Sequence, residues 1–307
     1  MNVLVGYTGF VGSNIYAKGC IDSAFNSRNI AEAYGLAPEL LIYAGLRAEK
    51  YLANHAPEKD MELIVQAQEN IRRIAPQKLV LISTVDVLRD PVGKDEDAEI
   101  ETENLHAYGL NRYRLECWVR ENYPNALIIR LPGLFGENLK KNFIYDYINV
   151  IPFMLRGDKF DELGTKQPAL ADYYALQDNG FYKVRELAPG EKKALRGMFR
   201  SLGFTALNFT DSRSVYQFYP LERLWDDIQR AIKADVRLWH PATEPISAAE
   251  LYFALCGGGF ENILPGTPAH YDYRTLHAEL FGGSGGYICS KDRIIQSIKE
   301  FVDRHGE

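Results

Sequence analysis

Three glycines at three-residue intervals stand near the start of the chain, in the segment VLVGYTGFVGSN. Gly6, Gly9 and Gly12 follow a short apolar run and lead into a stretch with helical spacing. In a strand-turn-helix unit, the first glycine permits the tight turn and the second lets the backbone approach a pyrophosphate. The third lets the helix pack closely on the strand. The helix N-terminus adds free N–H groups and partial positive charge. The spacing therefore predicts a dinucleotide site, with the turn residues Tyr7, Thr8, Phe10 and Val11 beside the phosphates.

The residues after the second expected strand bear on which dinucleotide binds. A carboxylate there would hold the ribose 2′-OH of NAD, whereas a basic residue suits the 2′-phosphate of NADP. The sequence reads Phe25-Asn26-Ser27-Arg28, with no acid at the tip. Arg28 and Ser27 can hold a phosphate by charge-assisted hydrogen bonds, with Asn26 beside them. We expect NADP as the cofactor, with NAD as the second choice. The alternative for Arg28 is a solvated loop side chain that contacts no ligand.

A second group of reactive side chains combines hydroxyls with a tyrosine and an arginine. Ser83 and Thr84 end the apolar run LVLIST, and Tyr108 and Arg112 lie four residues apart in AYGLNRYRLE. Residues four apart share one face of a helix, so the guanidinium is expected beside the phenol. A fixed positive charge there favours phenolate, which predicts a lowered pKa for the tyrosine. The same spacing recurs in Tyr43/Arg47, Tyr219/Arg223 and Tyr287/Lys291, but Tyr108 follows the strand that ends in hydroxyls.

The elements that position these groups alternate between strand and helix over residues 1–136. Short apolar runs predict strands at Asn2–Val5, Ile21–Phe25, Leu40–Ala44, Leu79–Ile82 and Ala126–Leu131. Helical spacing predicts helices over Phe10–Lys18, Glu58–Ala75 and Tyr108–Asn122, and a short helix ending near Gly35. This alternation predicts an α/β fold with a Rossmann-type, doubly wound parallel sheet. Only one strand fits between Gly6 and Ala44. The sheet is therefore expected to have one strand fewer than a Rossmann-type sheet usually has.

The second half of the chain has a different character. Residues 137–307 are richer in aromatic side chains and predict a smaller α+β substrate domain, with segments around 210–235 returning to the first domain. Ser247 and Glu250 form a capping box, and a closing helix is expected after Ser290. A strand is expected over Val215–Tyr219. The basic helical stretch around Lys192 and Arg196 fits a solvated face better than a diphosphate site.

The glycine turn, LVLIST, HAYGLNRYRLE and IIRLPGLFG occur in the order found in the extended short-chain dehydrogenase/reductases. The chain resembles their NAD(P)-dependent nucleotide-sugar epimerase/dehydratase branch, and most of all its dTDP-4-dehydrorhamnose-reductase-like members. In that family a Ser or Thr hydroxyl and a Tyr phenol bind the substrate carbonyl oxygen. A Lys four residues after the Tyr holds the nicotinamide ribose, and here Arg112 takes its place.

The resemblance assigns roles residue by residue. It implies that Thr84, or Ser83, is the hydroxyl, Tyr108 the proton donor and Arg112 the clamp on the cofactor. Further cofactor contacts are implied for Ala44, Gly45, Ser83, Pro132 and Leu134. Substrate contacts are implied for Asp86, Asn142 and Arg213. A homodimer is expected from the same likeness.

The reaction is narrowed by elimination within that family. Dehydratases carry an acid pair directly after the catalytic Thr, whereas Val85 and then Asp86 follow here. A keto-sugar reductase needs only a hydride source, a proton donor and a pocket, which favours an NADP-dependent reductase acting on a nucleotide-activated sugar. A nucleotide-sugar epimerase of the same family stays open. So does an NADP-binding sensor with weak turnover, because arginine cannot relay protons as an amine can.

Composition excludes other classes. Hydrophobic residues make up 46% and charged residues 25%, as in ordinary globular proteins rather than disordered ones. The net charge of −6 argues against a nucleic-acid binder. Four separated cysteines without a CxxC pair fit free thiols in a reducing compartment. The six histidines show no metal-ligand spacing, so we expect no metal. No membrane span or signal peptide is predicted, and a cytoplasmic protein is expected.

Overall fold

A computed structural model describes residues 1–306 of the chain. The chain folds into two compact units, each built from several segments. Unit 1 comprises Met1–Leu139, Val215–Ile246 and Ala269–Ser297. Unit 2 comprises Lys140–Ser214, Ser247–Pro268 and the residues from Ile298 onward.

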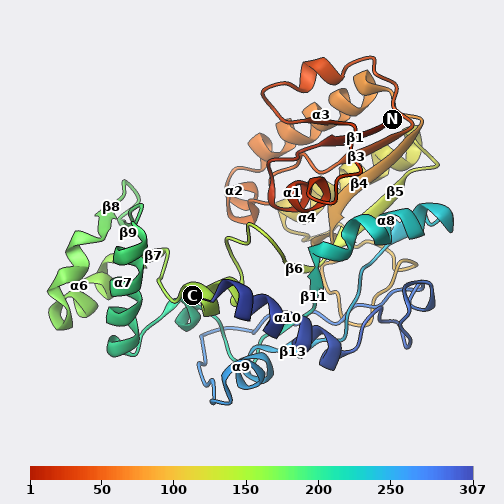
Figure 1. Cartoon of the computed structure of the whole chain (residues 1–307). Coiled ribbons are helices and arrows are strands. Elements are labelled where there is room, and N and C mark those ends of the chain that lie inside the picture. Colours follow the sequence, from red (N-terminus) through yellow and green to blue (C-terminus); the bar gives the residue numbers. More distant parts are fainter. Residues whose placement is uncertain (307) are drawn as a thin grey trace. The chain divides into compact units, whose positions relative to one another are not determined.

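Unit 1 is organised around a parallel sheet of six strands, shown with its helices in Figure 1. The strand order is β12-β5-β4-β3-β1-β2. The strands are β1 (Asn2–Val5), β2 (Ser23–Phe25), β3 (Leu40–Tyr43), β4 (Lys78–Thr84), β5 (Leu127–Leu131) and β12 (Leu238–Trp239). All four residues of β3 and all five of β5 are buried, because helices cover both faces of the sheet.

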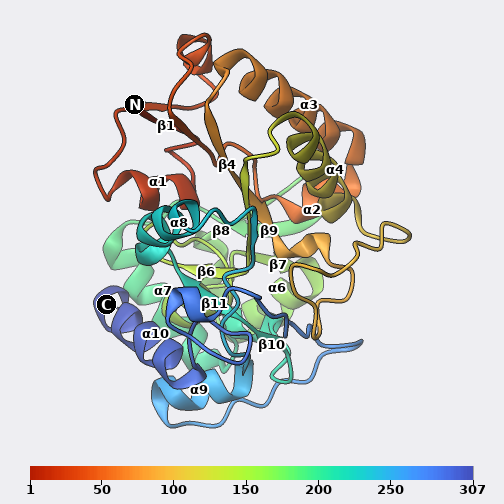
Figure 2. The same ribbon diagram turned by 90° about the vertical axis from the view of Figure 1, so that its right-hand side faces the viewer.

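Helices lie on both faces of this sheet, as Figure 2 shows. One face carries α1 (Phe10–Tyr16) and α8 (Leu224–Lys233). The other carries α2 (Lys50–His55), α3 (Pro57–Ile74) and α4 (Ala107–Asn122). Ile64, Ile71 and Leu115 are fully buried in the core under α3 and α4. The doubly wound parallel sheet predicted from the alternating pattern is confirmed.

Several predicted boundaries needed correction. The first helix ends at Tyr16 rather than Lys18, and the second strand begins at Ser23 rather than Ile21. The prediction of a single strand between β1 and β3 is confirmed, because β2 alone lies there. The strand expected over Val215–Tyr219 is wrong. It divides at Gln217 into β10 (Val215–Tyr216) and β11 (Phe218–Pro220), because the two pieces pair in two different sheets.

Smaller elements complete unit 1. Strand β11 pairs in parallel with β6 (Gly133–Phe135), and β10 pairs with β13 (Ile246–Ser247). Helix α10 (Lys291–His305) begins in this unit, where the Ser290 carbonyl accepts the Ile294 N–H, as expected after Ser290. The short 3₁₀ turns are η1 (Ile30–Ala33), η2 (Val85–Val87), η5 (Leu221–Arg223) and η6 (Glu279–Phe281).

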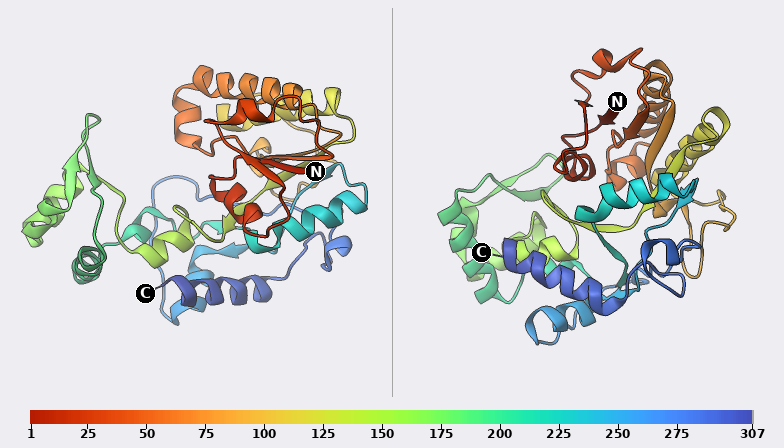
Figure 3. Two further views of the ribbon diagram at one scale, coloured as in Figure 1. Left: turned by 45° about the horizontal axis from the view of Figure 1, so that its top comes forward. Right: turned by 45° about the vertical axis from the view of Figure 1, so that its right-hand side comes forward.

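Unit 2 contains a small antiparallel sheet, which is coloured green in Figure 3, and its own helices. Its strand order is β7-β9-β8, from β7 (Met154–Arg156), β8 (Tyr174–Leu176) and β9 (Phe181–Val184). Its helices are α5 (Phe143–Asn149), α6 (Gly157–Lys166), α7 (Pro189–Leu202) and α9 (Ala248–Cys256), with turns η3 (Pro168–Asp172) and η4 (Ala206–Phe209). The capping box at the start of α9 is confirmed, since Ser247 and Glu250 exchange bonds of 3.1 and 2.8 Å.

Among the described residues, no helix combines the length and the apolar character that crossing a membrane requires.

Candidate active site

The parallel sheet of unit 1 gathers the predicted cofactor residues at one edge. Strands β1 to β5 run in the same direction, so their carboxyl ends meet at the same edge of the sheet. The segments that leave this edge contain Gly6, Asn26, Ala44, Thr84 and Pro132. Five regions far apart in the sequence therefore contribute to one surface.

The glycine turn (Gly6–Gly12) is packed so tightly that side chains are excluded at two of its glycines. Gly6 has φ +95°, and a Cβ there would meet Gly45 N at 2.8 Å. A Cβ on Gly12 would lie 2.7 Å from the Gly6 carbonyl carbon. At Gly9 a Cβ would meet only the Gly6 carbonyl oxygen, at 3.3 Å, and Gly9 caps α1 without a side-chain bond. The turn thus leaves backbone accessible at Gly9, which fits the close approach of a pyrophosphate.

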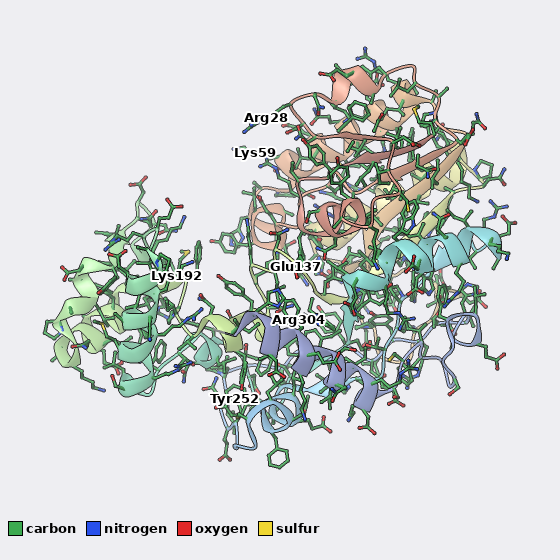
Figure 4. All side chains as sticks on the ribbon, viewed as in Figure 1. Arg28, Lys59, Glu137, Lys192, Tyr252 and Arg304 are labelled. Carbon is green, nitrogen blue, oxygen red and sulfur yellow. The ribbon has the colours of Figure 1, made fainter. Side chains whose placement is uncertain are left out.

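The loop after β2 presents a basic side chain to solvent. Asn26 Oδ1 accepts the Arg28 N–H at 2.9 Å, and Asn29 Oδ1 accepts the Asn26 N–H at 2.8 Å. This tight turn leaves Ser27 and Arg28 exposed. Figure 4 shows the Arg28 side chain at the periphery of unit 1, pointing away from the ribbon. The charge needed for the predicted phosphate contact is therefore accessible.

The two hydroxyls at the end of β4 point to different surroundings. Ser83 is buried and donates a 2.6 Å bond to Glu116, which is also paired with the buried Arg130 at 2.7 Å. Thr84 instead lies near the Tyr108 phenol and lowers the pKa of that phenol, and its hydroxyl oxygen accepts the Asp86 N–H at 3.2 Å. Of the two hydroxyls expected from the sequence, the structure brings Thr84 to Tyr108 and commits Ser83 to the core.

Tyr108 lies in the first turn of α4 and is only 7% exposed. Its backbone N–H donates to Asn54 Oδ1 at 3.0 Å, and the neighbouring His106 caps the helix by accepting the Gly109 N–H at 3.0 Å. Gly109 has no room for a side chain, because a Cβ there would lie 3.0 Å from the Asp86 carbonyl carbon. Close packing of α4 on η2 thus fixes where the phenol sits.

The pKa of Tyr108 departs from the sequence-based expectation. Burial raises it above the usual 10, and the Arg112 charge lowers it by less than burial raises it. The charges of Asp86 and Asp60 raise it further, while the nearby Thr84 hydroxyl lowers it. The expected lowering of the pKa by Arg112 is therefore wrong in net direction, because desolvation of the phenolate outweighs one cation. The phenol is protonated at neutral pH, as a proton donor requires.

Arg112 is turned into the protein. Its side chain is 3% exposed and forms an ion pair with Asp60 of α3, which is 6% exposed. Its Nη2 donates to the Arg47 carbonyl at 2.8 Å, and its Cζ lies 3.9 Å from the centre of the Tyr108 ring. The guanidinium thus joins α3, α4 and the loop after β3, and the contact with a nicotinamide ribose stays a prediction.

Asp86 is the centre of a polar cluster that the sequence did not reveal. Its Oδ1 accepts from Lys50 Nζ at 2.9 Å and from the Tyr271 hydroxyl at 3.0 Å. Burial and the Asp86 charge raise the pKa of Tyr271, so this phenol is also protonated at neutral pH. Burial, followed by the Lys50 charge, lowers the pKa of the nearby His106. We call Lys50, Asp86 and Tyr271 the Asp86 cluster.

Two of the predicted substrate residues, Asn142 and Arg213, belong to unit 2. Asn142 Oδ1 accepts the Tyr145 N–H at 3.1 Å, and the residue has φ +114°, a backbone strain often found at ligand sites. Arg213 forms a two-pronged ion pair with Asp211 at 2.9 and 2.7 Å. Their contacts with a substrate stay predictions.

The described residues contain no group of three or more His, Cys, Asp or Glu side chains placed to hold a metal ion.

Solved structures share this fold along nearly the whole chain. A dTDP-4-dehydrorhamnose reductase from Bacillus anthracis, in complex with NADP, is 16% identical with a TM-score of 0.63, over 99% of this chain and 98% of the other. RMD from Pseudomonas aeruginosa, complexed with NADPH, is 15% identical with a TM-score of 0.60, over 98% and 97%. A UDP-N-acetylglucosamine 4-epimerase from Methanobrevibacter ruminantium is 12% identical with a TM-score of 0.60, over 98% and 96%.

The likeness establishes the fold class: a Rossmann-type α/β protein with the architecture of nucleotide-sugar reductases and epimerases. No protein-family model matches the sequence, and no curated protein sequence matches it.

Proposed function

We propose that this protein is a member of the extended short-chain dehydrogenase/reductases that reduces the keto group of a nucleotide-activated sugar with NADPH. One observation carries the proposal. The glycine turn after β1 and the Thr84–Tyr108 pair at the end of β4 lie on the same edge of one sheet. A dinucleotide held at the turn can extend along this edge toward the phenol. Unit 1 is then the dinucleotide-binding unit, and unit 2 corresponds to the predicted substrate domain.

The choice of NADPH is supported by the loop after β2 and by two structural neighbours. Arg28 is exposed, and the described loop Asn26–Asn29 carries no carboxylate that would compete for a 2′-phosphate. The neighbours from Bacillus anthracis and Pseudomonas aeruginosa were solved with NADP and NADPH. When bound, this cofactor supplies the hydride.

The chain's own residues would supply the rest of the reaction. Thr84 and Tyr108 hold the carbonyl oxygen, and the Tyr108 phenol donates its proton as that oxygen gains negative charge. Burial raises the pKa of the phenol, which keeps it protonated at neutral pH and available as the donor. Asp86, two residues after Thr84, would accept a hydrogen bond from a sugar hydroxyl in this proposal.

A second candidate is a dinucleotide-binding protein without turnover. It is favoured by Arg112, whose guanidinium is committed to Asp60 and cannot exchange protons with Tyr108. An epimerase of the same fold remains the other candidate reaction.

Turnover separates these candidates. The protein is incubated with NADPH and, in turn, with dTDP-4-dehydrorhamnose and with UDP-, GDP- and CDP-activated keto sugars, and absorbance at 340 nm is followed. A reductase oxidises NADPH with at least one of them, whereas an epimerase interconverts a UDP-sugar without net oxidation. NADPH binding without either reaction leaves the binding-protein candidate, and the reductase proposal then fails.

A further inference from the structure

The loop Ala44–Lys50 connects two parts of the candidate site. At its start, Gly45 lies against the glycine turn, since a Cβ built on Gly6 would be 2.8 Å from Gly45 N. At its end, Lys50 opens α2 and reaches Asp86 at 2.9 Å, two residues beyond Thr84. The loop therefore runs along the same path that a dinucleotide would take from the turn to the phenol.

Arg112 holds the middle of this loop. Its Nη2 donates to the Arg47 carbonyl at 2.8 Å, while its Nη1 bonds the Asp60 carboxylate and the Tyr108 carbonyl, the latter at 3.4 Å. With 3% of its side chain exposed, Arg112 offers a ligand almost no surface. Its charge is neutralised by Asp60 inside the protein.

Lys50 is placed differently. Its side chain is 43% exposed, so the ammonium is reachable from solvent, and the Tyr271 hydroxyl donates to the same Asp86 oxygen at 3.0 Å. An ammonium has three N–H donors, and one is directed at Asp86. The others are available to hydroxyl or phosphate oxygens of a ligand on this edge of the sheet. The carboxylate also limits where the flexible lysine side chain can reach.

We propose that Lys50 binds the nicotinamide-ribose half of the dinucleotide, and that Arg112 is a positioning residue that holds the loop carrying it. Arg112 thus anchors the loop, and Lys50 contacts the ligand. This inference rests on the proposed cofactor, but it requires no turnover.

The role of Lys50 is tested with two ligands, of which only one contains the nicotinamide half. NADPH carries the nicotinamide half, whereas adenosine 2′,5′-bisphosphate carries only the adenosine half with its 2′-phosphate. Binding of each is measured by isothermal titration calorimetry to the wild type, Lys50→Met, Lys50→Arg and the control Lys59→Met. Lys59 is an exposed lysine on the neighbouring helix α3.

Lys50→Met should weaken NADPH binding about tenfold, the size expected for one charge-assisted hydrogen bond from a half-exposed ammonium, and leave bisphosphate binding unchanged. Lys50→Arg should bind NADPH nearly as the wild type does, and Lys59→Met should change neither ligand. NADPH affinity unchanged in Lys50→Met, or an equal loss for both ligands, overturns the inference while the proposed cofactor stands. A wild type that binds neither ligand overturns the cofactor and the inference together.

Discussion

The buried ion pair between Arg112 and Asp60 allows a quantitative prediction about stability. Replacing Arg112 by Met leaves the Asp60 carboxylate, 6% exposed, with the Asn111 amide at 2.9 Å as its remaining side-chain partner in the described contacts. Removing one partner of a buried pair costs about 3–5 kcal/mol, because the other charge stays desolvated. Lysine keeps the charge but offers one nitrogen where Arg112 uses two, for Asp60 and for the Arg47 carbonyl, so Arg112→Lys should cost about 1–2 kcal/mol.

Urea unfolding followed by tryptophan fluorescence measures this loss, because Trp118, Trp225 and Trp239 all lie in unit 1. Asp60→Asn and the double variant Asp60→Asn/Arg112→Met complete a cycle. The double variant should lose less than the sum of the single variants, by about 1–3 kcal/mol. Arg114→Met, an exposed arginine on the same helix, should change stability by only about 0.5 kcal/mol. Additive losses, or a cost below about 1 kcal/mol for Arg112→Met, would refute the stated role of the pair.

Three further outcomes are expected. Arg28→Ala should weaken NADPH binding about ten- to hundredfold and leave NADH binding unchanged in fluorescence titrations, and equal effects on both would remove the phosphate contact. Burial, followed by the Arg130 charge, lowers the pKa of His240 from 6.5 to about 3. Between pH 6.5 and pH 3 the unfolded state therefore binds a proton at this residue that the folded state does not. The urea midpoint should therefore fall from pH 7 to pH 5, and less steeply in His240→Asn; parallel pH curves would contradict this. Burial raises the pKa of Asp146 to about 7 from 3.8, so stability from this group is present below 3.8 and is lost as the pH rises through 7. Asp146→Asn should raise the melting temperature more at pH 8.5 than at pH 5, and an equal change at both values would count against the buried carboxyl.

The central sheet was predictable from the sequence because its strands are covered on both faces. The run Leu40–Tyr43 is buried at every position, so it reads as a continuous apolar segment without alternation. Helix α3 was predictable for a similar reason, since its buried residues keep helical spacing up to Ile74. Helix α2 was missed, because six residues with a single buried side chain, Ala53, give no periodic pattern.

The candidate site was predictable only where its signal is local. The glycine turn and the Tyr108 helix are short motifs, and their spacing identifies them. The Asp86 cluster depends on contacts across 36 and 185 residues of sequence, and the Arg112–Asp60 pair spans 52. No spacing rule relates such residues, so Lys50, Asp60 and Tyr271 became visible only in the folded chain. The same long-range contacts reversed the expected pKa shift of Tyr108, since burial is a property of the fold.

The most direct test of the proposed chemistry removes a single oxygen atom from the site. Tyr108→Phe keeps the ring against the Arg112 guanidinium and deletes the proton donor. With NADPH and the keto sugar that the wild type reduces, kcat should fall about 100-fold or more while NADPH affinity is retained. Tyr113→Phe removes a phenol from the same helix and should retain wild-type turnover. Equal rates of NADPH oxidation in the wild type and Tyr108→Phe would contradict the assignment of Tyr108 as the proton donor.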